Sequence, residues 1–257
     1  MVTTPLVRRR PLPLCLPLAV LAALLGAAAA FAGQTVLLPW VTPTRGTLVQ
    51  SSDLFLLNPG PNTMLATLVF RRRGVPETNP PKASRTINPG ATLYVGNLMT
   101  LFQTPKVPGA VVITVDGDVA PVVTSFNNTF ARRNKFLDHL MARSAGDLAE
   151  PGELQYLVGL QQDATFVTSL FLFNPSTVAA TYEVDFVGLN GGALGSPLDV
   201  QLDAGLGTQI EPGPQQLGTH TGGFTVLLRV RKGQLLSSAQ VVNRTTGEPA
   251  YVPGVTR

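Results

Sequence analysis

The sequence predicts an all-β protein made of two similar antiparallel β-sandwiches in tandem. A phrase occurs twice, as LFLLNPGPN at residues 54–62 and as LFLFNPSTV at residues 170–178. Apolar residues alternate with polar ones in several segments of each copy, which is the period of a β-strand. Turn signals recur at short intervals, and charged residues make up only 13% of the chain. Short buried strands joined by turns explain both features.

Residues 1–32 have the layout of a secretory signal peptide. Three arginines at 8–10 precede an apolar run at 12–30, and Ala30-Phe31-Ala32 is a small-x-small cleavage site. We expect cleavage near Ala32 and a secreted, periplasmic or cell-surface protein. An uncleaved anchor helix is the alternative, which the prolines in and beside the run disfavour. No second apolar run long enough to span a membrane follows, so we expect no membrane span in the mature chain.

Composition limits the chemistry of the expected mature chain. Cys15 is the one cysteine, and Leu14 before it is not the small residue of a lipoprotein signal. The mature chain would therefore have neither a disulfide nor a thiol nucleophile. Without the three leader arginines, 16 lysines and arginines face 15 aspartates and glutamates. This balance gives no reason to expect nucleic acid or an anionic membrane as partner.

The repeat extends well beyond the opening phrase. When the chain is compared with itself at an offset of 116 residues, identical residues are spread over a stretch of about 75 positions. The matched pairs include Asn58 with Asn174, Phe70 with Phe186, Gly117 with Gly233, Asn127 with Asn243, and Thr129 with Thr245. Each copy is long enough to hold its own core. We therefore expect a first β-sandwich at residues 33–130 and a second at residues 154–257.

Strands follow from the alternation within each copy. Residues 180–186 place Ala, Tyr, Val and Phe on one face, and residues 66–70 match them in the first copy. Residues 224–230 predict another strand, which a turn at Lys232-Gly233 connects to a partner strand at residues 235–242. The repeated phrase is expected to be a strand that is buried on both faces. Asn-Pro ends this strand, because proline offers no N–H to a sheet.

Residues 131–153 differ from both copies. Phe136, Leu137, Leu140 and Met141 lie at helical spacing with charges between them, and Pro-Gly follows. The pattern predicts a short amphipathic helix and a linker. The helix would pack against one or both sandwiches, or else serve as an exposed docking helix for a partner.

The second copy resembles a repeat domain of secreted bacterial proteins. The resemblance rests on three phrases, GLQQD at 159–163, LFLFNP at 170–175 and VVNRTTGEP at 241–249, and on the ending YVP at 251–253. The first copy lacks the Thr-Gly-x-Pro ending, because the basic linker follows Thr129 and Phe130. The resemblance implies tandem immunoglobulin-like sandwiches in an exported protein. It implies no established activity and brings no catalytic residues.

Motifs for catalysis or metal binding are missing from the sequence. His139 and His220 are the two histidines, and neither has a serine or carboxylate at a recognisable spacing. Asp116-Gly117-Asp118 can be taken as a calcium loop, which needs six to eight oxygens. The second copy has Lys232-Gly233-Gln234 there, so a tight hairpin turn explains the retained glycine better. We expect no enzyme, cofactor or metal, although an enzyme with an unrecognised site stays open.

One basic cluster is a candidate binding site. Arg71, Arg72 and Arg73 are followed by Lys82 and Arg85, whereas their counterparts at 187–189 are neutral. The cluster would bind an anionic polymer or form a solvated hairpin tip. Trp40 is the sole tryptophan and the best candidate for stacking on a sugar. The possible ligand-binding residues are therefore Arg71, Arg72, Arg73 and Trp40.

Two functions from different classes fit these features. The first is a non-enzymatic exported protein that acts as a structural, adhesive or interaction module of the cell envelope or extracellular space. Its partner would be an envelope or extracellular protein or polysaccharide. The alternative is a carbohydrate-binding or enzyme-accessory module.

Overall fold

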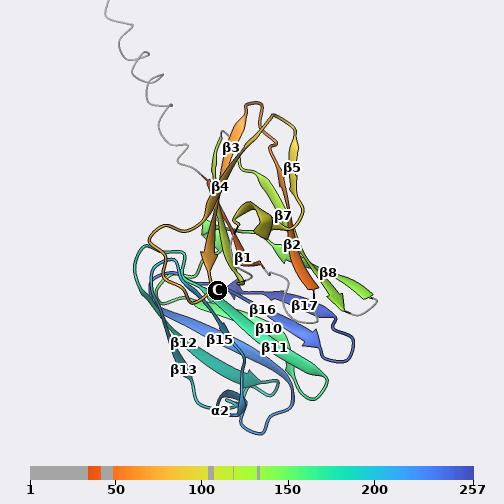
Figure 1. Cartoon of the computed structure of the whole chain (residues 1–257). Helices are drawn as coiled ribbons and strands as arrows, with labels where there is room; N and C mark the ends of the chain where they lie inside the picture. Colours follow the sequence, from red (N-terminus) through yellow and green to blue (C-terminus); the bar gives the residue numbers. More distant parts are fainter. Residues whose placement is uncertain (1–33, 42–48, 104–106, 118, 132–133) are drawn as a thin grey trace, which may run out of the picture. The chain divides into compact units, whose positions relative to one another are not determined.

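The computed structural model describes residues 34–41, 49–103, 107–117, 119–131 and 134–257. These residues form four antiparallel sheets within one compact unit (Figure 1). The expected signal peptide and its cleavage site near Ala32 lie outside the described residues. Within the described part, no helix is long and apolar enough to cross a membrane.

The first half of the chain forms two sheets. One has the strand order β4-β3-β6-β1-β9 and the other has the order β5-β2-β7-β8. Their bounds are β1 Gln34–Val41, β2 Val49–Leu57, β3 Met64–Arg72, β4 Lys82–Ile87, β5 Thr92–Val95, β6 Gly109–Asp116, β7 Val122–Ala131, β8 Asn134–Met141 and β9 Arg143–Ser144. A short 3-10 helix, Leu98–Leu101, follows β5.

The second half repeats this arrangement strand for strand. Its sheets have the orders β13-β12-β15-β10-β18 and β14-β11-β16-β17. Their bounds are β10 Leu154–Gln162, β11 Phe166–Phe173, β12 Ala180–Gly188, β13 Leu198–Leu202, β14 Gly207–Ile210, β15 Gly222–Lys232, β16 Leu236–Asn243, β17 Pro249–Pro253 and β18 Val255–Thr256. A short helix α2, Pro214–Leu217, precedes β15. The all-β prediction is therefore confirmed, and the two halves have matching strand orders.

Each half has its own hydrophobic core between its two sheets. The inward residues of β3, Ala66, Leu68 and Phe70, pack with residues of both first-half sheets. In the second half, Tyr182 of β12 is fully buried, and its hydroxyl donates to the Gln234 carbonyl oxygen at 2.5 Å. Burial raises the pKa of the Tyr182 hydroxyl. The predicted alternation on these strands is confirmed.

The repeated phrase ends a strand in both halves. β2 ends at Leu57 and β11 at Phe173, so Asn58 and Asn174 directly follow them. The Asn58 amide donates to the carbonyl oxygens of residues 62 and 87, at 2.8 and 3.0 Å. The Asn174 amide donates to those of residues 178 and 203, at 2.7 and 3.1 Å. These acceptors lie 116 positions apart, so the two corners share the same hydrogen bonds.

The helix expected in residues 131–153 is wrong. Residues 134–141 form β8, which pairs with β7, and residues 143–144 form β9, which pairs with β1. Among the described residues of this segment, only Ala145–Asp147 is helical, as one 3-10 turn. Four apolar residues within six positions fit a helix and a strand alike, and β7 offers an unpaired edge to the segment. The sheets of the first half therefore run past residue 130, to Ser144.

Two glycine turns are also corrected. Asp116-Gly117 and Lys232-Gly233 were expected to make hairpins, but β6 and β7 lie in different sheets, as do β15 and β16. Both turns therefore cross between the two sheets of one half. Gly233 needs the left-handed conformation, with φ of +78°. A Cβ atom there would lie 2.5 Å from the Ala180 Cβ, so close packing also requires glycine.

Candidate functional site

The basic cluster lies where the two halves of the chain meet. The Arg73 guanidinium donates to the Gln209 side-chain oxygen of β14. Arg71 lies beside Gly205 of the second half, where a Cβ atom would come within 3.4 Å of its guanidinium carbon. Arg72 instead forms an ion pair of 2.5 Å with Glu77 of its own half. The cluster thus contributes to an internal contact, and it is not a solvated hairpin tip.

Of the remaining sequence candidates, His139 and His220 lie in different halves and are not brought together. The backbone of Trp40 belongs to β1, but its side chain lies outside the described residues. His139 is exposed on β8, 2.7 Å from the Thr124 hydroxyl, whereas the His220 ring nitrogen donates to the Gly223 carbonyl oxygen. Asp118 lies outside the described residues. Within the described part, no group of three His, Cys, Asp or Glu residues can hold a metal ion.

The apolar part of the contact between the halves joins two sheet faces. β1 lies against β11 and β16. Leu37 and Ala110, with Leu148, form one buried cluster with Phe173 and Leu236. Because Leu38 and Val111 point into the first core, Leu37 and Ala110 lie on the outer face of β4-β3-β6-β1-β9. This face packs on the outer face of β14-β11-β16-β17.

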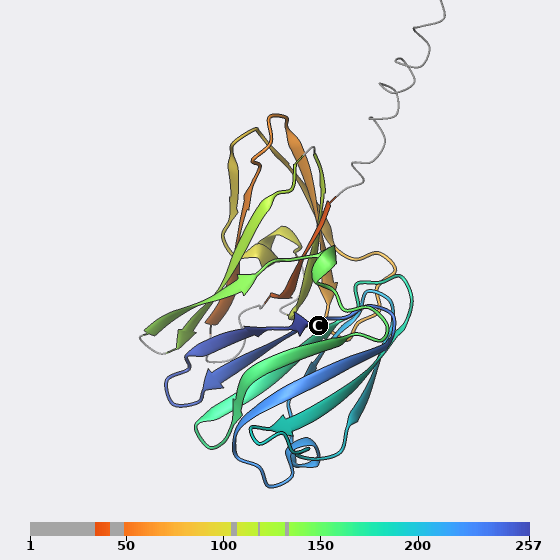
Figure 2. The same ribbon diagram turned by 180° about the vertical axis from the view of Figure 1, so that it is seen from behind.

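A buried carboxylate joins the halves beside this cluster. Asp138 of β8, which lies against β17 (Figures 1 and 2), accepts hydrogen bonds from the second half. The donors are the Tyr251 N–H at 2.9 Å and the Gln240 amide at 3.1 Å. Burial raises the pKa of the Asp138 carboxyl, although these bonds and His139 oppose the rise. Burial likewise raises the pKa of Tyr251 to about 12.

Replacing Asp138 with asparagine is expected to stabilise the fold at neutral pH and leave its stability unchanged in acid. Below the pKa of an unfolded aspartate, about 3.9, the carboxyl is neutral in both states. The stability that the protonated Asp138 carboxyl contributes is fully present below this unfolded pKa. It is lost as the pH rises through the higher pKa of the folded state. We therefore expect the asparagine chain to be more stable than the wild type at neutral pH. Urea unfolding of both chains across this pH range measures the difference.

The asparagine can accept from Tyr251 and donate to Gln240 once the Gln240 amide turns over. Asp138→Ala cannot do this, so it should destabilise the chain at every pH. A stability difference between the wild-type and Asp138→Asn chains that stays constant with pH would contradict the assignment.

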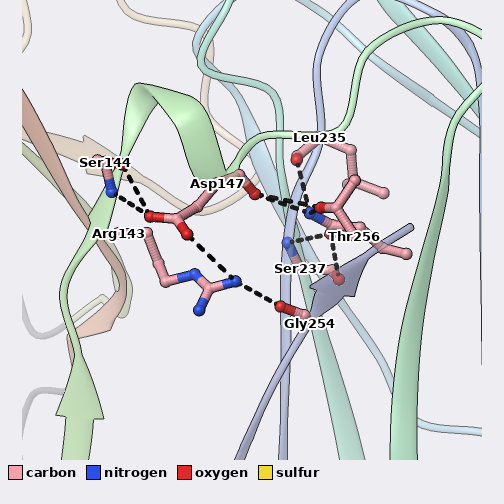
Figure 3. A network of polar contacts seen from close by, with 8 residues as sticks. Arg143, Ser144, Asp147, Leu235, Ser237, Gly254 and Thr256 are labelled. Carbon is pink, nitrogen blue, oxygen red and sulfur yellow. Dashed lines mark hydrogen bonds and ion pairs between the residues drawn. The ribbon is translucent and has the colours of Figure 1, made fainter.

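A polar network closes the contact near the ends of β9 and β18 (Figure 3). The Arg143 guanidinium donates to the Gly254 carbonyl oxygen at 2.6 Å and lies 4.0 Å from the Asp147 carboxylate. Burial alone would raise the pKa of Asp147, but two hydrogen bonds from Ser144 and the charge of Arg143 lower it. Buried Gln155 of β10 donates to the Asp147 carbonyl oxygen at 3.2 Å. Arg143 and Asp147 therefore take part in the contact between the two halves.

An open groove of about 680 Å³ lies beside this network. It runs between the start of β7 and the segment after β9, and most of its lining is apolar. Its charged residues, Arg143 and Asp147, are bonded within the network described above. The groove offers no catalytic arrangement.

The ladder registers show which face the contact buries. Phe171 pairs with Ser238 in the second half, as Phe55 pairs with Thr124 in the first. Phe171 and Ser238 are 3% and 0% exposed, because the first half covers the outer face of β14-β11-β16-β17. Phe55 and Thr124 lie on the matching face of β5-β2-β7-β8, where both are only partly buried.

This open face carries a row of aromatic rings across four strands. Tyr94 of β5 contacts Phe55 of β2, with ring centroids 4.8 Å apart and the ring planes tilted by 32°. Phe55 contacts Phe126 of β7 at 6.1 Å, and Phe126 contacts His139 of β8 at 5.2 Å. Tyr94 is 56% exposed. Other exposed apolar residues on these strands are Val122, Phe130, Leu137 and Met141. We call this surface the aromatic face.

A few polar groups border the aromatic face. The Asp53 carboxylate accepts from the Asn97 N–H at 2.9 Å and lies 3.5 Å from the Tyr94 hydroxyl. The arrangement is thus an apolar platform with fixed polar groups at its edge, which is suited to binding. Sequence reasoning missed it, because the repeated phrase was expected to be buried on both faces in both copies. That holds for β11 and fails for β2.

No protein-family profile matches the chain, and no curated protein matches it either.

Proposed function

We propose that the chain is a non-enzymatic interaction module that binds its partner through the aromatic face. The signal-peptide layout of residues 1–32 supports export to the cell envelope or extracellular space. The strand orders support two immunoglobulin-like sandwiches. In the first, β3-β6-β1 lies opposite β5-β2-β7-β8, and in the second, β12-β15-β10 lies opposite β14-β11-β16-β17.

One observation carries the proposal. The same sheet face occurs twice, and the second copy of it is covered by protein. The first copy is open and carries the aromatic residues Tyr94 and Phe126 where the covered copy has Gln209 and Gln240. Continuous exposed apolar surface is typical of interaction sites, and aromatic residues are enriched there.

Replacing Tyr94 with aspartate is expected to weaken partner binding at least tenfold, about 1.4 kcal/mol. A charge placed beside Phe55 would have to lose its water on contact with a partner. The measurement is retention of envelope proteins and polysaccharides by the immobilised chain, compared between wild type and variant. Because Tyr94 is exposed, the variant should remain folded.

Val178→Asp is the matched control, since Val178 is 52% exposed in the loop between β11 and β12 of the second half. It should leave retention unchanged. Equal retention by the wild-type and Tyr94→Asp chains would remove the aromatic face as the binding surface.

Carbohydrate binding is the second candidate function. Sugars stack on exposed aromatic rings and hydrogen-bond to carboxylates, and Tyr94 presents its ring beside Asp53. This favours the aromatic face over the basic cluster for such binding, because Arg72 and Arg73 are already paired. Saturable retention of one polysaccharide, lost on Tyr94→Ala, would support this candidate. Retention unaffected by Tyr94→Ala would exclude it.

A further inference from the structure

We propose that the partner bound by the aromatic face is a second copy of this chain, attached head to tail. The proposal rests on the proposed function, because it assigns an occupant to the same face. It starts from the internal contact, in which the outer face of β4-β3-β6-β1-β9 covers the outer face of β14-β11-β16-β17. The chain contains a second version of both faces.

The second version of the covering face is defined by register. Leu37 pairs with Val112 and Arg143 in the first half, and Tyr156 pairs with Leu227 and Val255 in the second. Val255 therefore takes the place of Arg143. We call the outer face of β13-β12-β15-β10-β18 the docking face.

Arg73 and Leu189 also occupy equivalent positions in the two halves. Arg73 follows β3, which pairs with β6, and Leu189 follows β12, which pairs with β15 in the same register. Arg71 pairs with Ala110, and Val187 pairs with Thr225 at the equivalent rung. Leu189 is 80% exposed and Val255 is 51% exposed. The docking face is thus open and bears aliphatic side chains where the covering face bears arginines.

The docking face and the aromatic face differ from the two faces of the internal contact at matching positions. In the internal contact, Arg73 donates to Gln209. Gln209 pairs with Phe171 as Tyr94 pairs with Phe55, so Tyr94 takes the place of Gln209. The pair equivalent to Arg73 with Gln209 is therefore Leu189 with Tyr94. An aliphatic side chain and an aromatic ring thus replace this polar pair in the open version, so these parts of the docking face and the aromatic face can pack on one another.

The geometry of such a contact sets the form of the assembly. The docking face and the aromatic face are different surfaces on different halves, so one copy offers each face once. A contact of this kind is heterologous and adds copies head to tail, either in a closed ring or in an open chain.

Sedimentation of the full chain over a range of concentrations tests the inference, using the variants Tyr94→Asp and Leu189→Asp. The wild-type chain is expected to associate beyond the dimer as its concentration rises. In each variant alone, every contact would include one damaged face, so both should sediment as monomers. Each variant keeps the face that the other has lost. Their equimolar mixture should therefore form a dimer and nothing larger.

Several results would overturn the inference. They are a monomeric wild-type chain, a mixture that stays monomeric while the wild type associates, and association removed by Tyr94→Asp but not by Leu189→Asp. The last result would indicate contact between two aromatic faces. All chains carry the same residues 1–33, so association through that segment would persist in every variant. The Val178→Asp control should sediment as the wild type does.

The failure of this inference differs from failure of the proposed function. A monomeric wild-type chain that retains an envelope component, and loses it on Tyr94→Asp, overturns self-association but supports the aromatic face as a binding surface.

Discussion

Replacing Asn174 with alanine is expected to lower the free energy of unfolding by about 3 kcal/mol, because it leaves buried carbonyl groups without donors. Asn174 is 0% exposed. Its amide donates to the carbonyl oxygens of residues 178, 202 and 203, at 2.7, 3.3 and 3.1 Å. Its side-chain oxygen accepts from the Ser176 N–H and hydroxyl. Urea unfolding of both chains measures the loss.

Three variants separate this explanation from a general effect of losing an asparagine. Asn190→Ala removes an exposed asparagine with one hydrogen bond to Gly192 and should cost less than about 1 kcal/mol. Asn174→Asp has the same shape but presents an acceptor to carbonyl oxygens, so it should be at least as costly as alanine. Asn58→Ala should destabilise the first half similarly. Equal stability of the Asn174→Ala and Asn190→Ala chains would contradict the account.

Replacing Gly233 with alanine is expected to cost about 3 kcal/mol, from two separate causes. A left-handed conformation costs an alanine roughly 1–2 kcal/mol. The new methyl group would also lie 2.5 Å from the Ala180 Cβ, and such overpacking costs about 1–3 kcal/mol. The measurement is again the midpoint and slope of urea unfolding.

Gly191 provides the matched control for Gly233. Its φ is +82°, close to that of Gly233, but a Cβ atom there would meet nothing within 4 Å. Gly191→Ala should therefore show only the conformational cost. If the two alanine variants lose equal stability, the close approach to Ala180 contributes nothing and this part of the account is wrong.

Local features of the fold could be predicted from the sequence. Neighbouring residues determine the alternation of Ala66, Leu68 and Phe70 and the ends of β2 and β11 at Asn-Pro. The duplication can be read directly by comparing two segments of the sequence. Proline ends a strand through its own missing N–H, and a strand's alternation follows from its own backbone. These predictions needed no knowledge of distant partners.

Features that depend on distant partners were missed. Residues 134–141 form a strand because β7 offers them an edge, which their own apolar spacing does not reveal. Arg73 forms its hydrogen bond with Gln209, a residue 136 positions away. Phe55 and Phe171 occupy matching places in the same phrase, yet the first half covers only Phe171. The aromatic face follows from the contact between the halves and not from either copy alone.

The central claim is that one sheet face is open in the first half and closed in the second. Labelling of cysteines placed at two equivalent positions tests it most directly. In a Cys15→Ser background, Thr124→Cys lies on the aromatic face and Ser238→Cys lies on its covered counterpart. In dilute protein, we expect the Thr124→Cys thiol to react with a thiol reagent near the rate of a free thiol. The Ser238→Cys thiol should be protected at every concentration until the fold opens. Equal reaction rates at the two positions would contradict the account.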